Sequence, residues 1–155
     1  MVEQGVSLDA QPAAARSHRF RDAGDVRIQL EAGPFAAALA RSALIPIERR
    51  VDDELMADVR LLVSELVTNS VRHAHMPPPG AVTVDVSLDA RTIHVEVRDS
   101  GPGFEPRGRR AGQSKAGGWG LFLVERLADR WGVMRNTCTN VWFEIDLGRA
   151  PTAAI

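Results

Sequence analysis

Apolar and polar residues alternate along several stretches of the chain, which is the pattern of strands that bury one face. The alternating stretches are residues 26–30, 82–88, 93–99 and 141–147. A turn at residues 89–91 lies between the second stretch and the third, so we expect these two strands to form an antiparallel hairpin. A further short strand is expected near Val133.

Between these strands the apolar spacing changes to that of amphipathic helices. A turn at residues 33–34 precedes an Ala-rich helix predicted over residues 35–46. A longer helix is predicted over residues 53–74, because the proline-rich residues 76–80 must end it. A third helix is predicted over residues 118–130. The apolar stripe of the longer helix consists of Leu55, Val59, Leu62, Leu66 and Val71.

This order of elements predicts an α+β fold. We expect a two-layer α/β sandwich in which a mixed, mostly antiparallel sheet carries its helices on one face. An N-terminal arm is expected over residues 1–24, a single domain over residues 25–148 and a short tail over residues 149–155. Residues 100–116 interrupt the pattern as a long loop rich in Gly, Pro and Arg, which is typical of a functional lid or of a disordered segment.

Composition and charge argue against several classes of protein. The 155 residues carry 19 basic and 20 acidic side chains, a net charge of −1, which is not that of a general nucleic-acid binder. No stretch approaches the roughly 20 apolar residues that span a bilayer, so no membrane association is expected. The single cysteine, Cys138, excludes an internal disulfide framework and a cysteine-based zinc cluster, and it favours the reducing cytoplasm.

Glu65 and Asn69 lie four residues apart in the long predicted helix, so they share one face, with His73 one turn further along. An asparagine can offer a neutral oxygen to Mg²⁺ whose other ligands are phosphates and water. A glutamate beside it can take a proton from an incoming hydroxyl group. A solvated polar stripe explains the same spacing, and for His73 alone it is the preferred interpretation.

Asp99 continues the odd-numbered apolar row of residues 93–97, so its side chain is expected to face the helices. A carboxylate buried there needs a hydrogen-bond donor, and the amino group of adenine is a suitable one. Gly101 and Gly103 follow, and glycine lets the backbone approach a flat base closely. An ordinary turn after a strand accounts for the same residues.

A glycine cluster over residues 117–121, Gly-Gly-Trp-Gly-Leu, opens the last predicted helix, where free backbone amides can bind an anion. Arg109, Arg110 and Lys115 in the preceding loop can add positive charge near phosphates. The spacing is that of neither a P-loop nor a Rossmann fingerprint. For the basic residues alone, a solvated loop is the simpler explanation.

In this order, the three motifs resemble those of the GHKL ATPase superfamily, whose Bergerat nucleotide-binding fold is shared by histidine kinases, gyrase, Hsp90 and MutL. Residues 64–74, 118–121 and 141–144 resemble more narrowly the bacterial anti-sigma factor serine/threonine kinases, including their stand-alone copies in actinobacteria. The resemblance covers about residues 25–148. One departure is that Cys-Thr-Asn stands at residues 138–140, where the family usually has Gly-Thr.

The resemblance implies a role for each matching residue. Asn69 would bind Mg²⁺, Glu65 would be the general base of phosphoryl transfer, and Asp99 would bind the adenine amino group. Residues 107–118 would form the ATP lid. The implied nucleotide-binding residues are Asn69, Arg72, His73, Asp99, Gly101, Gly103, Phe104, Lys115, Gly117, Gly118, Trp119, Gly120, Leu121 and Thr139.

The family implies an ATP-binding anti-sigma regulatory factor with protein serine kinase activity toward an anti-sigma antagonist. Its cofactors would be ATP and Mg²⁺. Its partners would be a sigma factor and an antagonist of STAS type in the cytoplasm, without direct contact to nucleic acid or membrane. Family members often pair through the first strand and helix, which leaves a homodimer open.

Two other functions compete with the kinase. The first is a nucleotide-dependent switch that binds its partner without phosphotransfer. Glu65 favours the kinase over this switch, because nucleotide binding alone needs Asn69 and Asp99 but no base. The second is the catalytic part of a histidine kinase, which is disfavoured because no upstream helical segment presents a phosphoacceptor histidine; His18 lies in the expected arm.

Overall fold

The computed structural model describes residues 26–73, 76, 79–101, 119–135 and 138–148 of the chain. In chain order its elements are β1 (Val26–Glu31), α1 (Ala36–Ser42), α2 (Ile45–Glu48), α3 (Asp53–His73), β2 (Ala81–Leu88), β3 (Thr92–Asp99), α4 (Trp119–Leu127), β4 (Arg130–Arg135) and β5 (Thr139–Asp146). The predicted strands and the long predicted helix are all present within these residues.

The strands form one sheet in the order β1-β2-β3-β5-β4. β2 and β3 make the predicted hairpin, with Val84 opposite Val97. The last strand lies inside the sheet, because β4 turns back into β5 and β5 then pairs with β3. All four pairings are antiparallel, so the parallel pairing that a mixed sheet would contain does not occur among the described strands.

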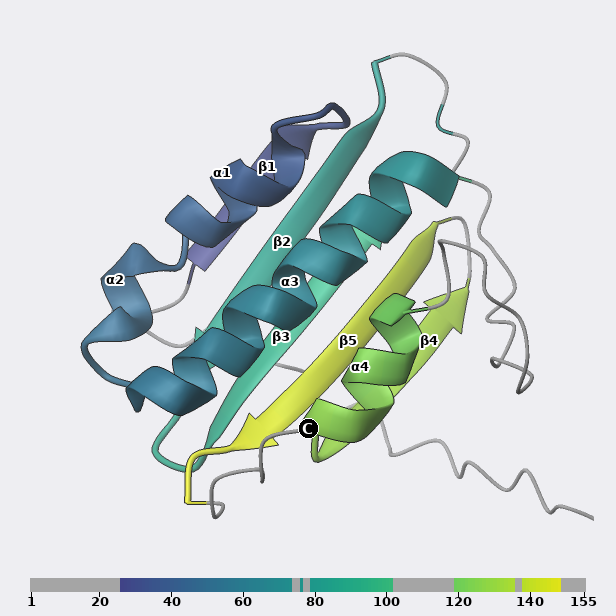
Figure 1. The fold of residues 1–155 in the computed structure, drawn as a ribbon. Coiled ribbons are helices and arrows are strands. Elements are labelled where there is room, and N and C mark those ends of the chain that lie inside the picture. Colours follow the sequence, from purple (N-terminus) through teal and green to yellow (C-terminus); the bar gives the residue numbers. More distant parts are fainter. Residues whose placement is uncertain (1–25, 74–75, 77–78, 102–118, 136–137, 149–155) are drawn as a thin grey trace, which may run out of the picture.

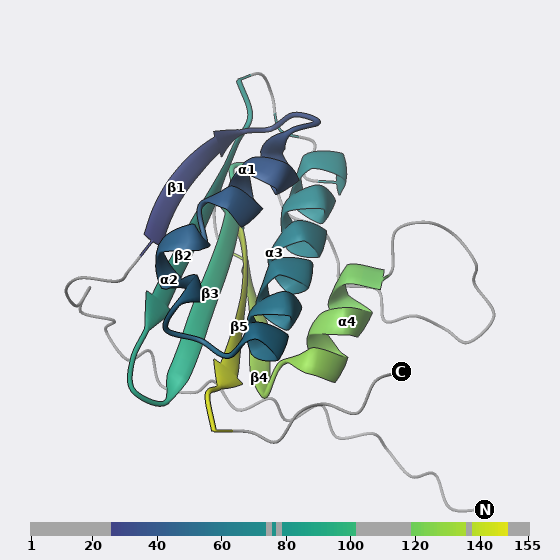
Figure 2. The ribbon, with the colours of Figure 1, turned by 60° about the vertical axis from the view of Figure 1, so that its left-hand side comes forward.

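The helices cover one face of this sheet, as predicted (Figure 1). α1 lies over β1, α3 lies along β2 and β3, and α4 lies over β5 and β4. Figure 2 shows the sheet and the helices as two separate layers. The predicted α/β sandwich is therefore confirmed.

The hydrophobic core fills the space between the two layers. The buried strand rows are Val82, Val84 and Val86, Ile93, Val95 and Val97, and Val141, Phe143 and Ile145. The predicted apolar stripe of α3 is buried against them, with Val71 partly buried at its end. Each fully buried aliphatic side chain stabilises the fold by about 1.5–3 kcal/mol, so this packing determines which face of α3 lies on the sheet.

Residues 35–46 do not form one helix, contrary to the prediction. α1 ends at Ser42, and α2 begins at Ile45 with Pro46 in its first turn. Proline has no N–H to donate, and its ring clashes with the carbonyl four residues earlier, so a continuous helix cannot pass through this point. The break turns Leu44 fully into the core.

The last helix is also shorter than predicted. α4 ends at Leu127 rather than at residue 130, because Arg130 already begins β4. The backbone N–H of Asp129 donates to the carbonyl of Glu144 at 2.9 Å. This bond joins the chain to β5 before another helical turn can form.

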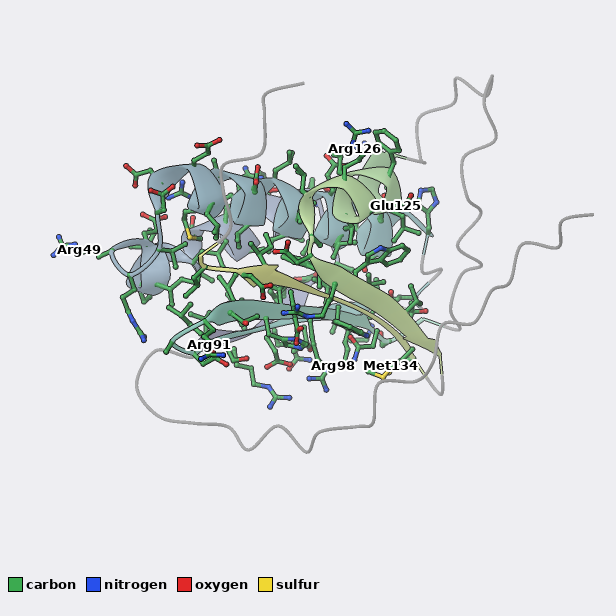
Figure 3. The ribbon with its side chains drawn as sticks, turned by 90° about the horizontal axis from the view of Figure 1, so that it is seen from below. Arg49, Arg91, Arg98, Glu125, Arg126 and Met134 are labelled. Atoms are coloured by element: carbon green, nitrogen blue, oxygen red, sulfur yellow. The ribbon has the colours of Figure 1, made fainter. Side chains whose placement is uncertain are left out.

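The face of the sheet opposite the helices carries a polar network, from which Arg98 extends (Figure 3). At its centre, Nε2 of His94 is 3.2 Å from Oε1 of Glu96, and Nδ1 is 3.1 Å from Oε1 of Glu144. A neutral imidazole has one N–H, so only the imidazolium can donate to both carboxylates. The ring also stacks on Trp142, with centroids 5.8 Å apart.

The hydrogen bonds of this network shift the pKa values of its side chains. Burial lowers the pKa of His94, but hydrogen bonds to Glu96 and Glu144 raise it more, so the pKa of His94 lies above its ordinary value. The hydrogen bond with His94 in turn lowers the pKa of Glu96 to about 2. The positive charge of His94 therefore stabilises the folded sheet.

The network predicts a pH-dependent stability. A group whose pKa is raised on folding stabilises fully below its unfolded pKa, about 6.5 for histidine, and this stabilisation is lost as the pH rises through the folded value. We expect the free energy of unfolding in urea to fall less between about pH 6 and about pH 8.5 in His94→Gln than in the wild type. His73→Gln, at an exposed position outside the network, is the control. Equal pH dependence in His94→Gln and the wild type would contradict this account.

Candidate functional site

Asp99, the last residue of β3, lies where the strand register predicts. Its side chain faces α3 and is 3% exposed. The backbone N–H of Gly101 donates to Oδ1 at 3.0 Å. Ser70 on α3 and the backbone of Thr139 on β5 lower the pKa of this carboxyl. The groups that act on the Asp99 carboxyl therefore come from the turn after β3, from α3 and from β5.

These surroundings supply too few hydrogen-bond donors to satisfy the Asp99 carboxyl completely. Burial raises the pKa of Asp99, and the hydrogen bonds from Gly101, Ser70 and Thr139 offset this only in part. A carboxylate offers about four acceptor positions, so at least one is free for a ligand. The amino group of adenine would fill it with a neutral donor.

Glu65 and Asn69 share the face of α3 that the beginning of α4 covers, and both are half-buried. A Cβ built at Gly120 would lie 2.2 Å from Nδ2 of Asn69 and 3.5 Å from Cβ of Glu65. A side chain has no room there, so glycine allows the approach. The first turn of α4, whose backbone N–H groups have no helical partners, thus lies against the acid–amide pair.

The C-terminal half of α3 therefore lies against the two elements that carry the other motifs, β3 and α4 (Figure 1). Asn69 meets the first turn of α4, and the next residue, Ser70, reaches the carboxyl at the end of β3. The tertiary structure brings together Glu65, Asn69, Asp99 and Gly120, which are spread over 56 residues of sequence.

Thr139 lies beside Asp99, because the two residues are paired across β5 and β3. Its side chain is 1% exposed, and its Oγ1 has no hydrogen-bond partner among the described residues. A buried hydroxyl without a partner is uncommon, and it can bind a ligand or a water molecule in the same pocket. Thr139 is thus at the site even though the expected preceding glycine is replaced by Cys138.

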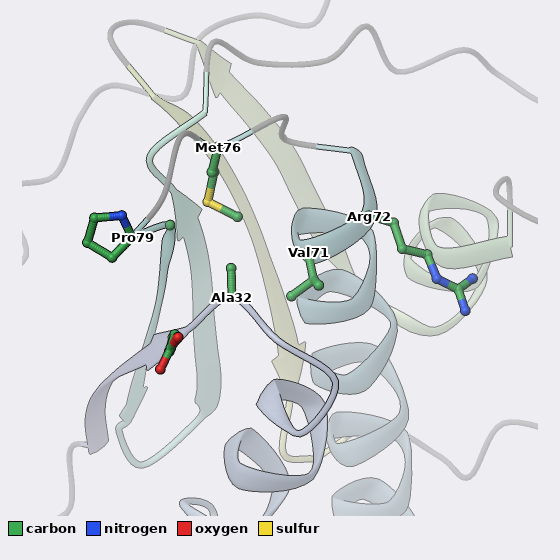
Figure 4. A pocket seen from close by; sticks show the side chains of 7 residues that line it. Ala32, Val71, Arg72, Met76 and Pro79 are labelled. Carbon is green, nitrogen blue, oxygen red and sulfur yellow. The ribbon is translucent and has the colours of Figure 1, made fainter.

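Arg72 and His73 are exposed at the end of α3. A hollow of about 310 Å³ opens nearby, lined by Glu31, Ala32, Val71, Arg72, Met76, Pro79 and Gly80. Figure 4 shows Val71 and Met76 facing this hollow, whereas the Arg72 side chain extends away from it. Neither Asn69 nor Asp99 lines it, so this hollow is separate from the candidate site.

The remaining predicted site residues form two groups, one outside the described residues and one in α4. Gly103, Phe104, Lys115, Gly117 and Gly118 lie outside the described residues, as does the whole of the predicted lid at residues 107–118. Trp119 is the first residue of α4, and Leu121 is partly buried against the core. The roles assigned to all of these residues stay predictions.

Ser70 is the site residue that the motifs did not indicate. It is 5% exposed and contacts Asp99 directly. The signal was present, since position 70 follows Leu66 by one helical turn and so continues the apolar stripe with a polar residue. A polar residue on a buried row acts on its surroundings, and here Ser70 lowers the pKa of the Asp99 carboxyl.

No group of three or more His, Cys, Asp or Glu side chains that could hold a metal ion occurs within the described ranges. The amide oxygen of Asn69 could still be one ligand of a Mg²⁺ ion held mainly by phosphates and water. In the described part of the chain, no helix has both the length and the apolar character needed to cross a membrane.

Comparison with known proteins identifies the class of this protein. Residues 30–145 match the family model described as histidine kinase-like ATPase domain. The match covers well over half of the chain, so the chain belongs to this family. The predicted membership of the GHKL group is thereby confirmed.

Individual relatives show which members of this family the chain is similar to. The serine-protein kinase RsbW of Listeria innocua is 33% identical over 118 residues, covering 67% of this chain and 75% of that protein. The anti-sigma F factor of Anoxybacillus flavithermus is 29% identical over 84 residues, covering 52% of this chain and 58% of that protein. The histidine kinase domain of Erythrobacter litoralis EL346 blue-light activated histidine kinase has a TM-score of 0.51 at 24% identity, covering 72% of this chain and 61% of that chain. This last likeness concerns the fold alone.

The contact at Gly120 predicts a separation of stability from nucleotide binding. In Gly120→Ala, the added methyl would displace the amide of Asn69, which is the flexible end of a side chain. We expect the free energy of unfolding to change by no more than about 1 kcal/mol while Mg²⁺-dependent ATP affinity falls at least tenfold. Gly148→Ala, with nothing within 4 Å of the new methyl, is the matched control. Wild-type ATP affinity in Gly120→Ala would refute the proposed place of Asn69 in the site.

Proposed function

We propose that this protein is an ATP- and Mg²⁺-dependent protein serine kinase that acts as an anti-sigma regulatory factor. The observation that carries the proposal is the contact of Gly120 with Asn69 and Glu65. It brings a carboxylate, a side-chain amide and a helix N-terminus to one spot, which supports the roles proposed for them below. The names of the relatives, serine-protein kinase RsbW and anti-sigma F factor, support the same function.

The nucleotide would lie between α3, α4 and the ends of β3 and β5. Asp99 would accept a hydrogen bond from the adenine amino group, and the free hydroxyl of Thr139 would face the same edge of the base. The first turn of α4 would bind phosphate oxygens through its backbone N–H groups. Asn69 would hold Mg²⁺, which, when bound, neutralises phosphate charge.

The chemical step would use Glu65 as the base. Its carboxylate would take the proton from the serine hydroxyl of the protein substrate while the hydroxyl oxygen attacks the γ-phosphorus. The bond from that phosphorus to the β,γ-bridging oxygen breaks, and ADP leaves. Glu65 makes no hydrogen bond or ion pair within the described residues, so its carboxylate is free to accept a proton.

The proposed substrate is a serine of an anti-sigma antagonist of STAS type, and the second partner is a sigma factor. Phosphorylation would end the binding of the antagonist to the kinase and leave the kinase free to bind the sigma factor. Both partners act in the cytoplasm, which is therefore the proposed location. A switch without phosphotransfer would need Asn69 and Asp99 but would have no use for Glu65.

Variants at Glu65 and Asn69 distinguish the kinase from the switch. In Glu65→Gln we expect ATP affinity close to wild type, with phosphate transfer from labelled ATP to an antagonist slower by about 10²–10⁴-fold. In Asn69→Ala we expect Mg²⁺-dependent ATP binding itself to be lost. Glu125→Gln is the control, because Glu125 lies exposed on the outer side of α4 (Figure 3). If ATP binds but the wild type transfers no phosphate to any antagonist offered, the switch is correct.

A homodimer through the first strand and helix is part of the proposal. Among the described strands, β1 is an edge strand that pairs on one side only, with β2. Beside it, the α1–α2 segment exposes large apolar side chains, with Phe35 74%, Leu39 52% and Ile45 61% exposed. An open sheet edge next to an apolar patch is the kind of surface that a second copy covers.

Charge on this patch should separate the protomers. We expect Leu39→Glu to sediment as a monomer at concentrations where the wild type is a dimer, because a buried carboxylate without a partner is costly at an interface. Leu61→Glu, which introduces the same charge at an exposed leucine of α3, is the control and should stay dimeric. A wild type that sediments as a monomer at all concentrations would remove the dimer from the proposal.

A further inference from the structure

Leu61 is the large apolar side chain that α3 exposes to solvent. It is 41% exposed, whereas the leucines of the same helix that face the sheet are buried. The other exposed large apolar residues of the described ranges lie away from α3: Phe35, Leu39, Ile45 and Met134. A single exposed leucine is ordinary in a soluble domain, so the position of Leu61, rather than its exposure, calls for an explanation.

That position is in line with the proposed catalytic pair. Leu61, Glu65 and Asn69 follow one another at intervals of four residues in the unbroken helix α3. Residues four apart lie on one face of a helix, with Cβ atoms about 5–6 Å apart. Glu65 therefore has the amide of Asn69 one turn toward the C-terminus and the exposed side chain of Leu61 one turn toward the N-terminus.

The geometry of phosphoryl transfer gives this order a meaning. The attacking and leaving oxygens lie roughly in line, on opposite sides of the phosphorus. The nucleotide is proposed to lie at Asn69 and the first turn of α4, which contacts Asn69 and Glu65 from one side. The serine of a protein substrate must then reach Glu65 from the other side, within about 2.6–3.2 Å of its carboxylate. The segment that carries this serine covers Leu61.

We propose that Leu61 is a docking residue for the protein substrate, on which an apolar side chain close to the phosphoacceptor serine packs so that the serine hydroxyl is held at Glu65. The inference rests on the proposed kinase function and deepens it by naming the surface that the substrate covers. Leu61 takes no part in the chemical step.

The charged side chains on the α1 side of Leu61 are already engaged within the protein. Arg60 forms an ion pair with Glu48 of α2. Nη1 of Arg41 on α1 donates to the hydroxyl of Ser64 at 2.9 Å. An apolar side chain of a substrate can therefore cover Leu61 without separating either pair, and it removes apolar surface of Leu61 from water.

Two substitutions at Leu61 test the proposal, and neither threatens the fold at this exposed helical position. Leu61→Ala removes the apolar contact, adds no charge beside Glu65 and keeps a good helix former. Leu61→Glu places a carboxylate where an apolar partner would pack. Met134→Glu is the matched control, because Met134 is 47% exposed and lies on the side of the molecule opposite α3 (Figure 3).

The first measurement is the steady-state transfer of phosphate from labelled ATP. The probe is the purified STAS-type protein that the wild type phosphorylates fastest. We expect KM for this protein to rise about three- to tenfold in Leu61→Ala and at least about tenfold in Leu61→Glu. In Leu61→Ala, kcat and ATP affinity should stay within about twofold of wild type. An unchanged KM, or a loss confined to kcat or to ATP affinity, would overturn the inference.

The second measurement is equilibrium binding of the same STAS-type protein, without turnover, to the kinase saturated with a non-hydrolysable ATP analogue. Affinity should fall by the same factors in the two Leu61 variants and stay at the wild-type value in Met134→Glu. Unchanged affinity in both Leu61 variants would overturn the inference. Conversion of a wild-type dimer to a monomer by Leu61→Glu would overturn it as well, since a second copy of the chain would then cover Leu61.

The two measurements separate this inference from the function on which it rests. If the wild type bound ATP but phosphorylated no STAS-type protein, the proposed kinase would be wrong and Leu61 would have no substrate to dock. If the wild type transferred phosphate and both Leu61 variants kept the wild-type KM and affinity, the kinase would stand and the role of Leu61 would be wrong.

Discussion

The buried carboxyl of Asp99 is the constraint on which the candidate site depends. It ends β3 inside the core, where the backbone N–H of Gly101 donates a hydrogen bond to it and where Ser70 and the backbone of Thr139 lower its pKa. These groups belong to the turn after β3, to α3 and to β5. The register of the sheet and the placement of α3 therefore together determine the surroundings of this carboxyl.

The two faces of the sheet serve different purposes. Toward the helices, apolar rows from β2, β3 and β5 hold α3 in place, and the site forms where those rows end. On the outer face, His94 joins Glu96 and Glu144 in a charge network that ties β3 to β5. Because strand residues alternate between faces, the same two strands carry both the buried Asp99 and Thr139 on one face and this stabilising network on the other.

Much of this arrangement was predictable from local pattern. Alternation along residues 93–99 placed Asp99 on the helix side, and helical spacing placed Glu65 and Asn69 on one face. The break before Pro46 was also readable, since proline cannot lie inside a helix, but the Ala-rich composition of the segment concealed it. Ser70 was missed because one polar residue in an apolar row carries no chemistry until its partner is known.

The sequence by itself determined the periodicities, and therefore which side chains share a face, because neighbours along a strand or helix are related by fixed geometry. It also carried the motif order by which the chain resembles its family. Only the tertiary structure decided which faces meet: Gly120 lies against Asn69, and Thr139 pairs with Asp99 while its hydroxyl has no partner within the described residues. Those contacts join segments far apart in the chain, and they depend on sheet register and core packing, which no local pattern specifies.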